Sequence, residues 1–154
     1  MAATILYKRA TFVTQLPVGH LYAPSHCWLG PAGVGRWRVG FTKFALRMLG
    51  ELVDVQFEKP PGAPVQAGEI LGSIEGFKAL SDLYCVGQGT FVGGNPALRD
   101  DLECLARRPY DEGWLYEFAG TPDERCLTVE AYGSLLDVTI DRILEKQKGD
   151  DAAA

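Results

Sequence analysis

The sequence lacks any long hydrophobic run. Apolar residues make up 47% of its 154 residues, but Gly, Pro or a charged residue interrupts every stretch well before the roughly 18 consecutive apolar residues that a membrane span requires. Residues 1–19 also lack the apolar core and cleavage site of a secretory signal. These absences predict a soluble protein that does not contact a membrane.

A cysteine framework is also missing. The four cysteines are Cys27, Cys85, Cys104 and Cys126, and they form no C-x-x-C motif. With only two histidines in the chain, they do not suggest a zinc site, and we expect no bound metal. A chain of this length can fold without disulfides, so free thiols indicate a reducing, cytoplasmic location. Cys85 is most simply a strand residue, and Cys104 and Cys126 are most simply packing residues near helices.

Acidic residues are absent from residues 1–50, which contain six Lys or Arg. The whole chain nevertheless carries a net charge of −5. A nucleic-acid partner is not expected, because such proteins cluster Lys and Arg within a domain of net positive charge. We expect Arg36, Arg38, Lys43 and Arg47 to lie on solvated faces or to pair with the acidic half. A role for them in docking a protein partner stays open.

The length predicts one domain, and 18 Gly and nine Pro predict many turns. Apolar residues alternate with polar ones in residues 37–41 and 53–57, as in half-buried strands. Residues 4–13 suggest an additional edge strand. A final helix begins at Thr128 and carries an apolar stripe, followed by a frayed tail from Gly149. These patterns predict a mostly antiparallel β domain with short helices.

One lysine occupies a connection between two strands. Residues 76–79 separate strand-like runs at 69–75 and 83–92, which places Lys78 on an exposed turn. This position alone indicates no function, because most exposed lysines have none. A nucleotide-binding loop is not expected, since Gly33-Val34-Gly35 lacks the third glycine of the dinucleotide motif.

Several blocks of residues before and after this lysine form a recognisable series. They are Tyr22-Ala23-Pro24-Ser25-His26-Cys27-Trp28, Val39-Gly40-Phe41-Thr42, Leu49-Gly50-Glu51-Leu52-Val53, Lys78-Ala79-Leu80-Ser81-Asp82-Leu83-Tyr84, Pro109-Tyr110-Asp111-Glu112-Gly113-Trp114-Leu115 and Glu130-Ala131-Tyr132. The same blocks occur in this order in the glycine cleavage H-protein family, which the chain resembles over about residues 20–137.

The resemblance implies a lipoyl-domain-like flattened β-sandwich or barrelloid with short helices and a longer C-terminal helix. It divides the chain into an N-terminal extension (1–19), an H-protein-like lipoyl domain (20–137), and a C-terminal helix extension and tail (138–154). It also implies a monomer.

The resemblance assigns roles to six residues. Lys78 would carry lipoic acid through an amide bond, which removes the lysine charge. Glu75 and Gly89 match positions that attachment enzymes such as lipoate–protein ligase are thought to read. Ser25, Cys27 and Asp82 match the site where the lipoyl arm rests.

The departures from the family suggest a particular branch. Cys27 stands where glycine cleavage H proteins have an acidic residue, and a thiol beside a dithiolane suggests sulfur chemistry. Cys27 as a small buried hydrophobe is the alternative, and both stay open. Gly76-Phe77, Cys85-Val86, the N-terminal extension and the long final helix resemble H-like proteins that serve heterodisulfide reductase-like complexes in bacterial sulfur oxidation. The sequence interpretation favours this branch, with a glycine cleavage carrier and its enzyme partners as the alternative.

The non-carrier alternatives are an enzyme and a structural module without a cofactor. An enzyme using Cys27 would need a nearby base, but His26 is adjacent in sequence and would point to the opposite face of a strand. An enzyme using Lys78 as a nucleophile would need a desolvated pocket, whereas a turn is wet. A structural module without a cofactor leaves the lysine block unexplained. The interpretation is therefore a non-catalytic carrier.

Overall fold

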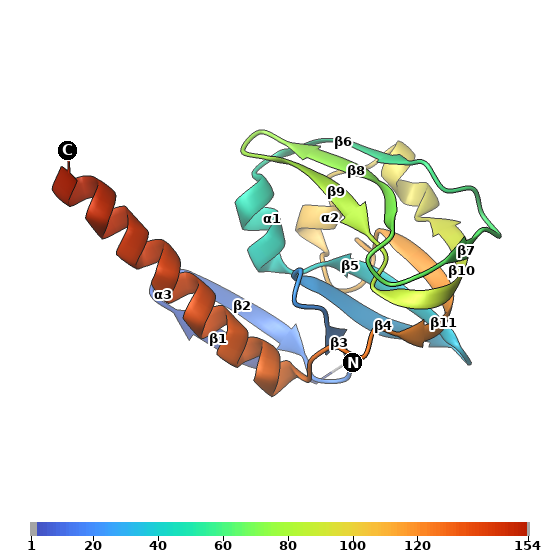
Figure 1. Cartoon of the computed structure of the whole chain (residues 1–154), viewed down its shortest axis with the longest axis horizontal. Coiled ribbons are helices and arrows are strands. Elements are labelled where there is room, and N and C mark those ends of the chain that lie inside the picture. The colour runs from blue at the N-terminus through green and yellow to red at the C-terminus, as the bar shows by residue number, and fades with distance from the viewer. Residues whose placement is uncertain (1–2, 154) are drawn as a thin grey trace.

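The computed structural model describes residues 3–153, with side chains through residue 150. It is mostly β with short helices and one long C-terminal helix, as expected (Figure 1). The elements are β1 (Thr4–Arg9), β2 (Phe12–Pro17), β3 (Leu21–Tyr22), β4 (Cys27–Gly33), β5 (Arg36–Phe41), α1 (Lys43–Leu49), β6 (Leu52–Phe57), β7 (Pro64–Val65), β8 (Ile70–Gly76), β9 (Leu80–Tyr84), β10 (Gly87–Gly94), the 3₁₀ turn η1 (Pro96–Arg99), α2 (Cys104–Arg107), β11 (Tyr116–Pro122) and α3 (Val129–Ala153).

Two antiparallel sheets form the body of the molecule. One has six strands in the order β3-β4-β5-β11-β10-β7, and the other has three in the order β6-β8-β9. Leu29 and Phe118 of the larger sheet belong to the same buried apolar cluster as Leu71 and Ile74 of the smaller one. Since this cluster joins both sheets, the expected flattened β-sandwich is confirmed.

The predicted alternation along residues 37–41 is visible in β5. Val39 is fully buried, while Arg36 and Arg38 reach outward and form ion pairs with Glu117 on the neighbouring strand β11. Glu117 is only 6% exposed, so its carboxylate needs these partners. The prediction that basic residues of the first half pair with the acidic half is confirmed for Arg36 and Arg38.

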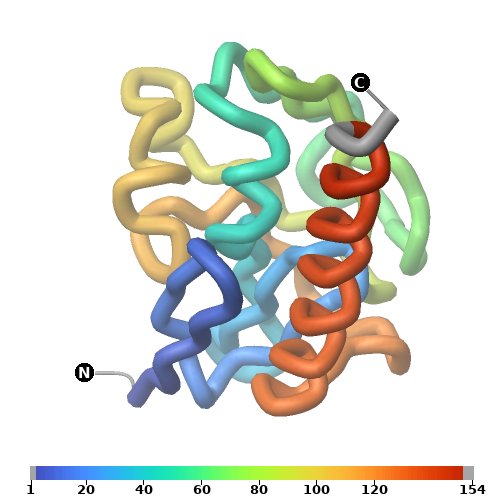
Figure 2. Tube along the Cα trace, turned by 90° about the vertical axis from the view of Figure 1, so that its left-hand side faces the viewer, coloured from blue at the N-terminus to red at the C-terminus, as the bar shows by residue number. Residues whose placement is uncertain are grey.

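The N-terminal segment differs from the expectation of an edge strand. Strands β1 and β2 pair with each other in a separate two-stranded sheet, and Ala10 makes the turn with a positive φ of 53°. Pairing within the hairpin satisfies its inner backbone groups locally, so it does not extend either sheet of the sandwich. The tip of this hairpin lies below α1 in Figure 2.

Helix α3 packs against the hairpin and continues further than expected. It is helical through Ala153 without a break at Gly149, where the sequence suggested a frayed tail; Ala154 is outside the described residues. The buried side chains of this second core include Phe12, Leu16, Tyr132, Leu136 and Ile140. The two ends of the chain therefore build one shared layer.

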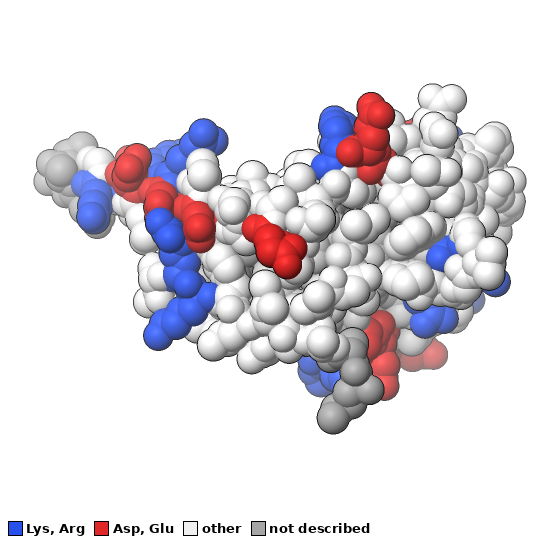
Figure 3. All heavy atoms as spheres, turned by 90° about the horizontal axis from the view of Figure 1, so that it is seen from below, with Lys and Arg blue, Asp and Glu red and all other residues white. Residues whose placement is uncertain are grey.

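Polar contacts also join the two ends. The Tyr7 hydroxyl donates to Asp137 at 2.7 Å, and Arg9 donates to both carboxylate oxygens of Asp141 at 2.9 and 2.7 Å. Figure 3 shows charges of both signs side by side on this projecting end of the molecule. Within residues 3–153, no helix is both long and apolar enough to cross a membrane.

Candidate functional site

Lys78 lies in the tight turn between β8 and β9. The register pairs Glu75 with Leu80, and the Gly76 N–H donates to Ala79 O at 2.9 Å, which closes the turn. The Lys78 side chain is exposed. The structure therefore places this lysine at a hairpin tip, the kind of connection predicted from the sequence.

This hairpin tip is docked on the C-terminal end of α1. The Phe77 N–H donates to Glu51 O and the Lys78 N–H donates to Leu49 O, both at 2.9 Å. Two glycines permit the close approach. A Cβ at position 76 would lie 2.2 Å from Leu49 O, and a Cβ at Gly50, whose φ is 75°, would lie 2.9 Å from Lys78 Cγ. The backbone of Lys78 is thus held on α1, while its side chain is exposed.

The side chain of Lys78 also contacts α1. Its Nζ donates to Arg47 O at 3.3 Å, so the ammonium supplies a partner for a carbonyl in the last turn of the helix. Acylation requires the neutral amine as nucleophile. The amine must therefore leave Arg47 O before a cofactor can be attached, and this exposed contact is weak enough to allow it.

A buried network positions the other end of α1. The Tyr132 hydroxyl of α3 contacts Thr42 Oγ1 at 2.8 Å and His26 Nδ1 at 2.9 Å, and Thr42 Oγ1 accepts the Ala45 N–H as the N-cap of α1. Burial lowers the pKa of His26 to about 4. A neutral imidazole can accept a hydrogen bond at Nδ1, so this network links α3 to the helix that holds Lys78.

The two residues expected to guide cofactor attachment lie in different sheets. Glu75 is exposed on β8, three residues before Lys78. Gly89 is on β10 in the larger sheet and is paired with Gly120 of β11. Both glycines have a positive φ, +146° at Gly89 and +152° at Gly120. A Cβ on Gly89 would lie 2.0 Å from Ala119 O. Strand packing by itself therefore requires glycine at position 89.

The three residues expected at an arm-resting site differ in exposure. Cys27 is 8% exposed and belongs to the sandwich core, and burial raises the pKa of its thiol to about 12. Ser25 and Asp82 are exposed. Among the described residues, no hydrogen bond or ion pair joins Asp82 to either of them. The geometry favours the alternative of Cys27 as a small buried hydrophobe over a reactive thiol.

The other cysteines are not activated either. Cys85 and Cys104 are buried and Cys126 is half-buried, and burial raises the thiol pKa of each, to about 11 for Cys126. Thiolates are the nucleophilic form, so these thiols are unreactive near neutral pH. Within the described part of the chain, no cluster of three or more His, Cys, Asp or Glu side chains could hold a metal.

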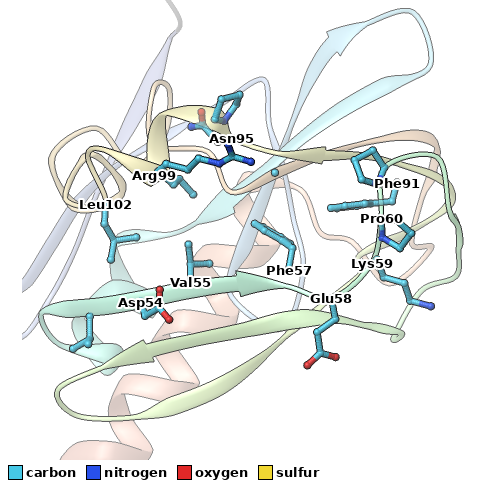
Figure 4. A pocket seen from close by; sticks show the side chains of 15 residues that line it. Asp54, Val55, Phe57, Glu58, Lys59, Pro60, Phe91, Asn95, Arg99 and Leu102 are labelled. Carbon is cyan, nitrogen blue, oxygen red and sulfur yellow. The ribbon is translucent and has the colours of Figure 1, made fainter.

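The cavities on the surface of the described residues include two of unequal size. The larger, about 1050 Å³, lies between β6 and η1 and is lined by Phe57, Arg99 and Leu102 (Figure 4). It includes none of the six site residues predicted from the sequence. The smaller, about 530 Å³, lies beside α1 and has Lys78 on its rim. The lysine makes the smaller cavity the one relevant to the site.

Sequence reasoning missed most residues around Lys78. The block Leu49-Gly50-Glu51 is part of the family resemblance in the sequence. That its carbonyl groups hold the hairpin tip is visible only in the tertiary structure. Phe12 and Ile140, which line the cavity beside Lys78, come from opposite ends of the chain and carry no local signal.

An exposed lysine on the docked hairpin tip of an antiparallel sandwich is the arrangement expected of a carrier domain. Comparison with known proteins specifies the family. The model of the family "Glycine cleavage H-protein" matches residues 20–134. The chain belongs to the glycine cleavage H-protein family, whose members are lipoyl carriers without catalytic activity of their own.

Individual relatives agree with this assignment. The chain is 37% identical over 123 residues to the glycine cleavage system H protein of Corynebacterium jeikeium, covering 78% of this chain and 96% of that protein. It is 38% identical over 127 residues to the one from Opitutus terrae, covering 80% and 99%. The crystal structure of a glycine cleavage system H protein from Mycobacterium marinum superposes with a TM-score of 0.69 at 35% identity, covering 77% of this chain and 97% of that one.

Proposed function

We propose that this chain carries lipoic acid on Lys78 and transports the aminomethyl group of glycine from glycine decarboxylase to the aminomethyltransferase. The single observation that carries the proposal is the placement of Lys78 at an exposed hairpin tip whose backbone is fixed on α1. The relatives named above are glycine cleavage system H proteins, which supports this pathway. The partners are a lipoate–protein ligase and the glycine cleavage enzymes.

The residues of the chain position the cofactor and do not react with its cargo. A bound lipoyl group would supply a dithiolane that, once reduced, accepts and releases the carried group. The turn closed by Gly76 and Ala79 places the lysine at an exposed position, and the hydrogen bond from Lys78 N–H to Leu49 O fixes the tip on α1. Glu75 stays exposed next to the turn, where an attachment enzyme can contact it.

The sequence favours sulfur oxidation chiefly because a thiol stands at position 27. That thiol is buried and its pKa is raised to about 12, so attack on a lipoyl disulfide is disfavoured. The relatives named above also carry no sulfur-oxidation function in their names. Glycine cleavage, the alternative in the sequence interpretation, is therefore the better-supported pathway.

Two measurements test the proposal separately. Incubation with lipoate and a lipoate–protein ligase, followed by peptide mass mapping, should place one lipoyl group on Lys78. Lys78→Ala should abolish it, and Lys8→Ala, at an exposed lysine of β1, should not. Lys78→Ala should change the free energy of unfolding by no more than about 0.5 kcal/mol, as for most surface substitutions.

The second measurement is lipoyl-dependent glycine decarboxylation, compared with the Corynebacterium jeikeium H protein. Turnover within about tenfold of that standard supports the glycine pathway. A chain that is lipoylated on Lys78 but inactive with glycine decarboxylase remains a carrier of a different cargo. A lipoyl group found on another lysine, or on none, overturns the assignment of Lys78.

A further inference from the structure

We propose that two copies of this chain associate through the free edge of β1, which pairs antiparallel with β1 of the second copy. The inference goes beyond the carrier function, since the pairing involves neither Lys78 nor a cofactor. Strand β1 lies before residue 20, outside the region that the family model matches. The interface is therefore built from a part of this chain that the family model does not cover.

The outer edge of β1 carries backbone groups that need a partner. The Val18 N–H donates to Ala3 O at 2.9 Å, so the backbone of Ala3 points toward β2, and every second residue along β1 does the same. The N–H and C=O groups of Thr4, Leu6 and Lys8 therefore point to the opposite edge. Among the described residues, no hydrogen bond from another element reaches these groups.

The other edge of the hairpin, on β2, has a partner in this chain. Val13 is paired with Lys8, and its outward carbonyl oxygen accepts a hydrogen bond from Lys43 Nζ at 2.9 Å. An unpaired strand edge is a template for pairing with another chain, and a sheet of two strands is marginally stable by itself. Of the two edges, the β1 edge is therefore the one that a second copy can extend.

The residues of β1 favour one register with a second copy. With the two-fold axis at Leu6, this leucine lies opposite Leu6 of the second copy, and each Thr4 lies opposite a Lys8. Each of these pairs exchanges two backbone hydrogen bonds. An axis at Lys8 would instead place two ammonium groups directly opposite each other, which is destabilising. The axis at Leu6 therefore uses every outward residue of β1 and opposes no like charges.

The same register covers the exposed apolar side chains of β1. Leu6 is 63% exposed and Ile5 is 39% exposed. Leu6 meets its copy on the outer face of the hairpin, and Ile5 lies opposite Tyr7 of the second copy on the face where Tyr7 contacts Asp137 of α3. Removing this apolar area from water adds to the backbone hydrogen bonds. Figure 1 shows the hairpin beside α3 and apart from the two sheets of the sandwich, so β1 is not an inner strand of either sheet.

The test exchanges the charge at the two-fold axis. The variants are Leu6→Lys and Leu6→Glu in the full chain. Each variant alone opposes two like charges across the axis, whereas an equimolar mixture opposes charges of different sign. We expect the mixed dimer to associate about tenfold more tightly than either variant with itself, measured by sedimentation velocity at low salt.

The matched controls are Val34→Lys and Val34→Glu. Val34 is a fully exposed apolar residue on the turn between β4 and β5, away from the hairpin. Both variants should dimerise as the wild type does, and mixing them should not change the association. Circular dichroism and the urea midpoint of all four variants verify that the fold is retained.

Amide exchange locates the contact in the wild type. As its concentration rises from about 1 μM to about 1 mM, the protein should shift from monomer toward dimer, since a single strand edge makes a small and weak interface. The amide protons of Leu6 and Lys8 should then exchange more slowly. Those of Ile5 and Tyr7, which point toward β2, should change little.

Three results would overturn the proposal. The first is a wild type that stays monomeric up to about 1 mM. The second is a dimer that is equally stable in the wild type, in each Leu6 variant and in their mixture, which would place the interface elsewhere. The third is assembly beyond a dimer, because an antiparallel pair of β1 edges is closed by its two-fold symmetry. None of these results bears on lipoylation of Lys78, which is measured separately.

Discussion

The backbone N–H of Lys78 donates to the carbonyl oxygen of Leu49 at 2.9 Å, so the tip of the β8–β9 hairpin is held by the last residue of α1. That carbonyl is one of the four at a helix C-terminus that have no partner within the helix. Satisfying it from another element fixes the position of Lys78. It also ties the lysine to α3 and the N-terminal hairpin, because both pack on α1.

Gly50→Ala tests this docking. Position 50 has a φ of 75°, and a Cβ there would lie 2.9 Å from Lys78 Cγ and 3.2 Å from Lys78 N. We expect the variant to lose about 2–4 kcal/mol of unfolding free energy, from left-handed strain and a displaced tip. The exchange rate of the Lys78 amide proton should rise, because its bond to Leu49 O is weakened.

The matched control is Gly68→Ala. Gly68 has a similar φ of 87°, but no atom lies within 4 Å of its Cβ position. Gly68→Ala should therefore lose only the backbone strain of about 1–2 kcal/mol, because no clash is added. It should leave the exchange rate of the Lys78 amide proton unchanged. Equal effects of the two substitutions would show that the tip does not depend on close contact with position 50.

Gly89→Ala should act on stability. Its Cβ would lie 2.0 Å from Ala119 O, which is backbone and cannot move without separating β10 from β11. We expect a loss of about 3 kcal/mol or more in urea unfolding. Gly93→Ala is the control on the same strand, because its φ of 148° is similar and the nearest atom, Pro61 Cγ, is 3.9 Å away.

A Gly89→Ala protein that is as stable as Gly93→Ala but is no longer lipoylated would contradict the structural role. That result would show that the attachment enzyme reads this position directly, as the resemblance implied.

His26 should make stability fall in mild acid. Its pKa is about 4 in the folded protein and near 6.5 when unfolded. Above pH 6.5 the imidazole is neutral in both the folded and the unfolded state, so protonation of His26 does not lower the free energy of unfolding. As the pH falls toward 4, the unfolded state binds a proton that the folded state does not, so about 3 kcal/mol is lost across this window. Urea midpoints measured from pH 7 to pH 4 test this.

His26→Asn is the control variant. Asn tolerates the positive φ of 69° at this position better than most residues, and it does not titrate. The slope of stability against pH should become shallower in His26→Asn. The part that remains belongs to His20, whose pKa is also lowered by burial, and to the paired carboxylates. An unchanged slope would mean that His26 is accessible to protons in the folded state.

The cysteines should resist alkylation in the native protein. Burial raises the pKa of Cys27 to about 12 and of Cys126 to about 11, so little thiolate exists at neutral pH. Cys126, which is half-buried, should react before Cys27, and all four should react rapidly only in denaturant. Peptide mapping after timed treatment with iodoacetamide measures the order. Rapid native alkylation of Cys27 would revive the sulfur-exchange interpretation.

Local patterns predicted what local forces decide. The alternation in β5 follows from side chains pointing to opposite faces of a strand, so the exposed Arg36 and Arg38 and the buried Val39 that follows them are readable from the sequence. The exposed turn at Lys78 follows from the segment 76–79 that interrupts two strand-like runs. In contrast, the sequence is compatible with Cys27 either as a reactive thiol or as a small buried hydrophobe. Only the tertiary structure shows that Cys27 is buried, because it lies in the core that both sheets share.

The sequence by itself determined the family, the sandwich of short antiparallel strands and the lysine at a hairpin tip, because these depend on periodicity, turn residues and the order of recognisable blocks. Only the tertiary structure decided that the hairpin tip rests on α1, that Gly89 faces Gly120, and that the two ends of the chain meet. Tyr7 contacts Asp137 across 130 positions of sequence. Such contacts depend on the packing of surfaces that are distant along the chain, and no local pattern specifies which surfaces will meet.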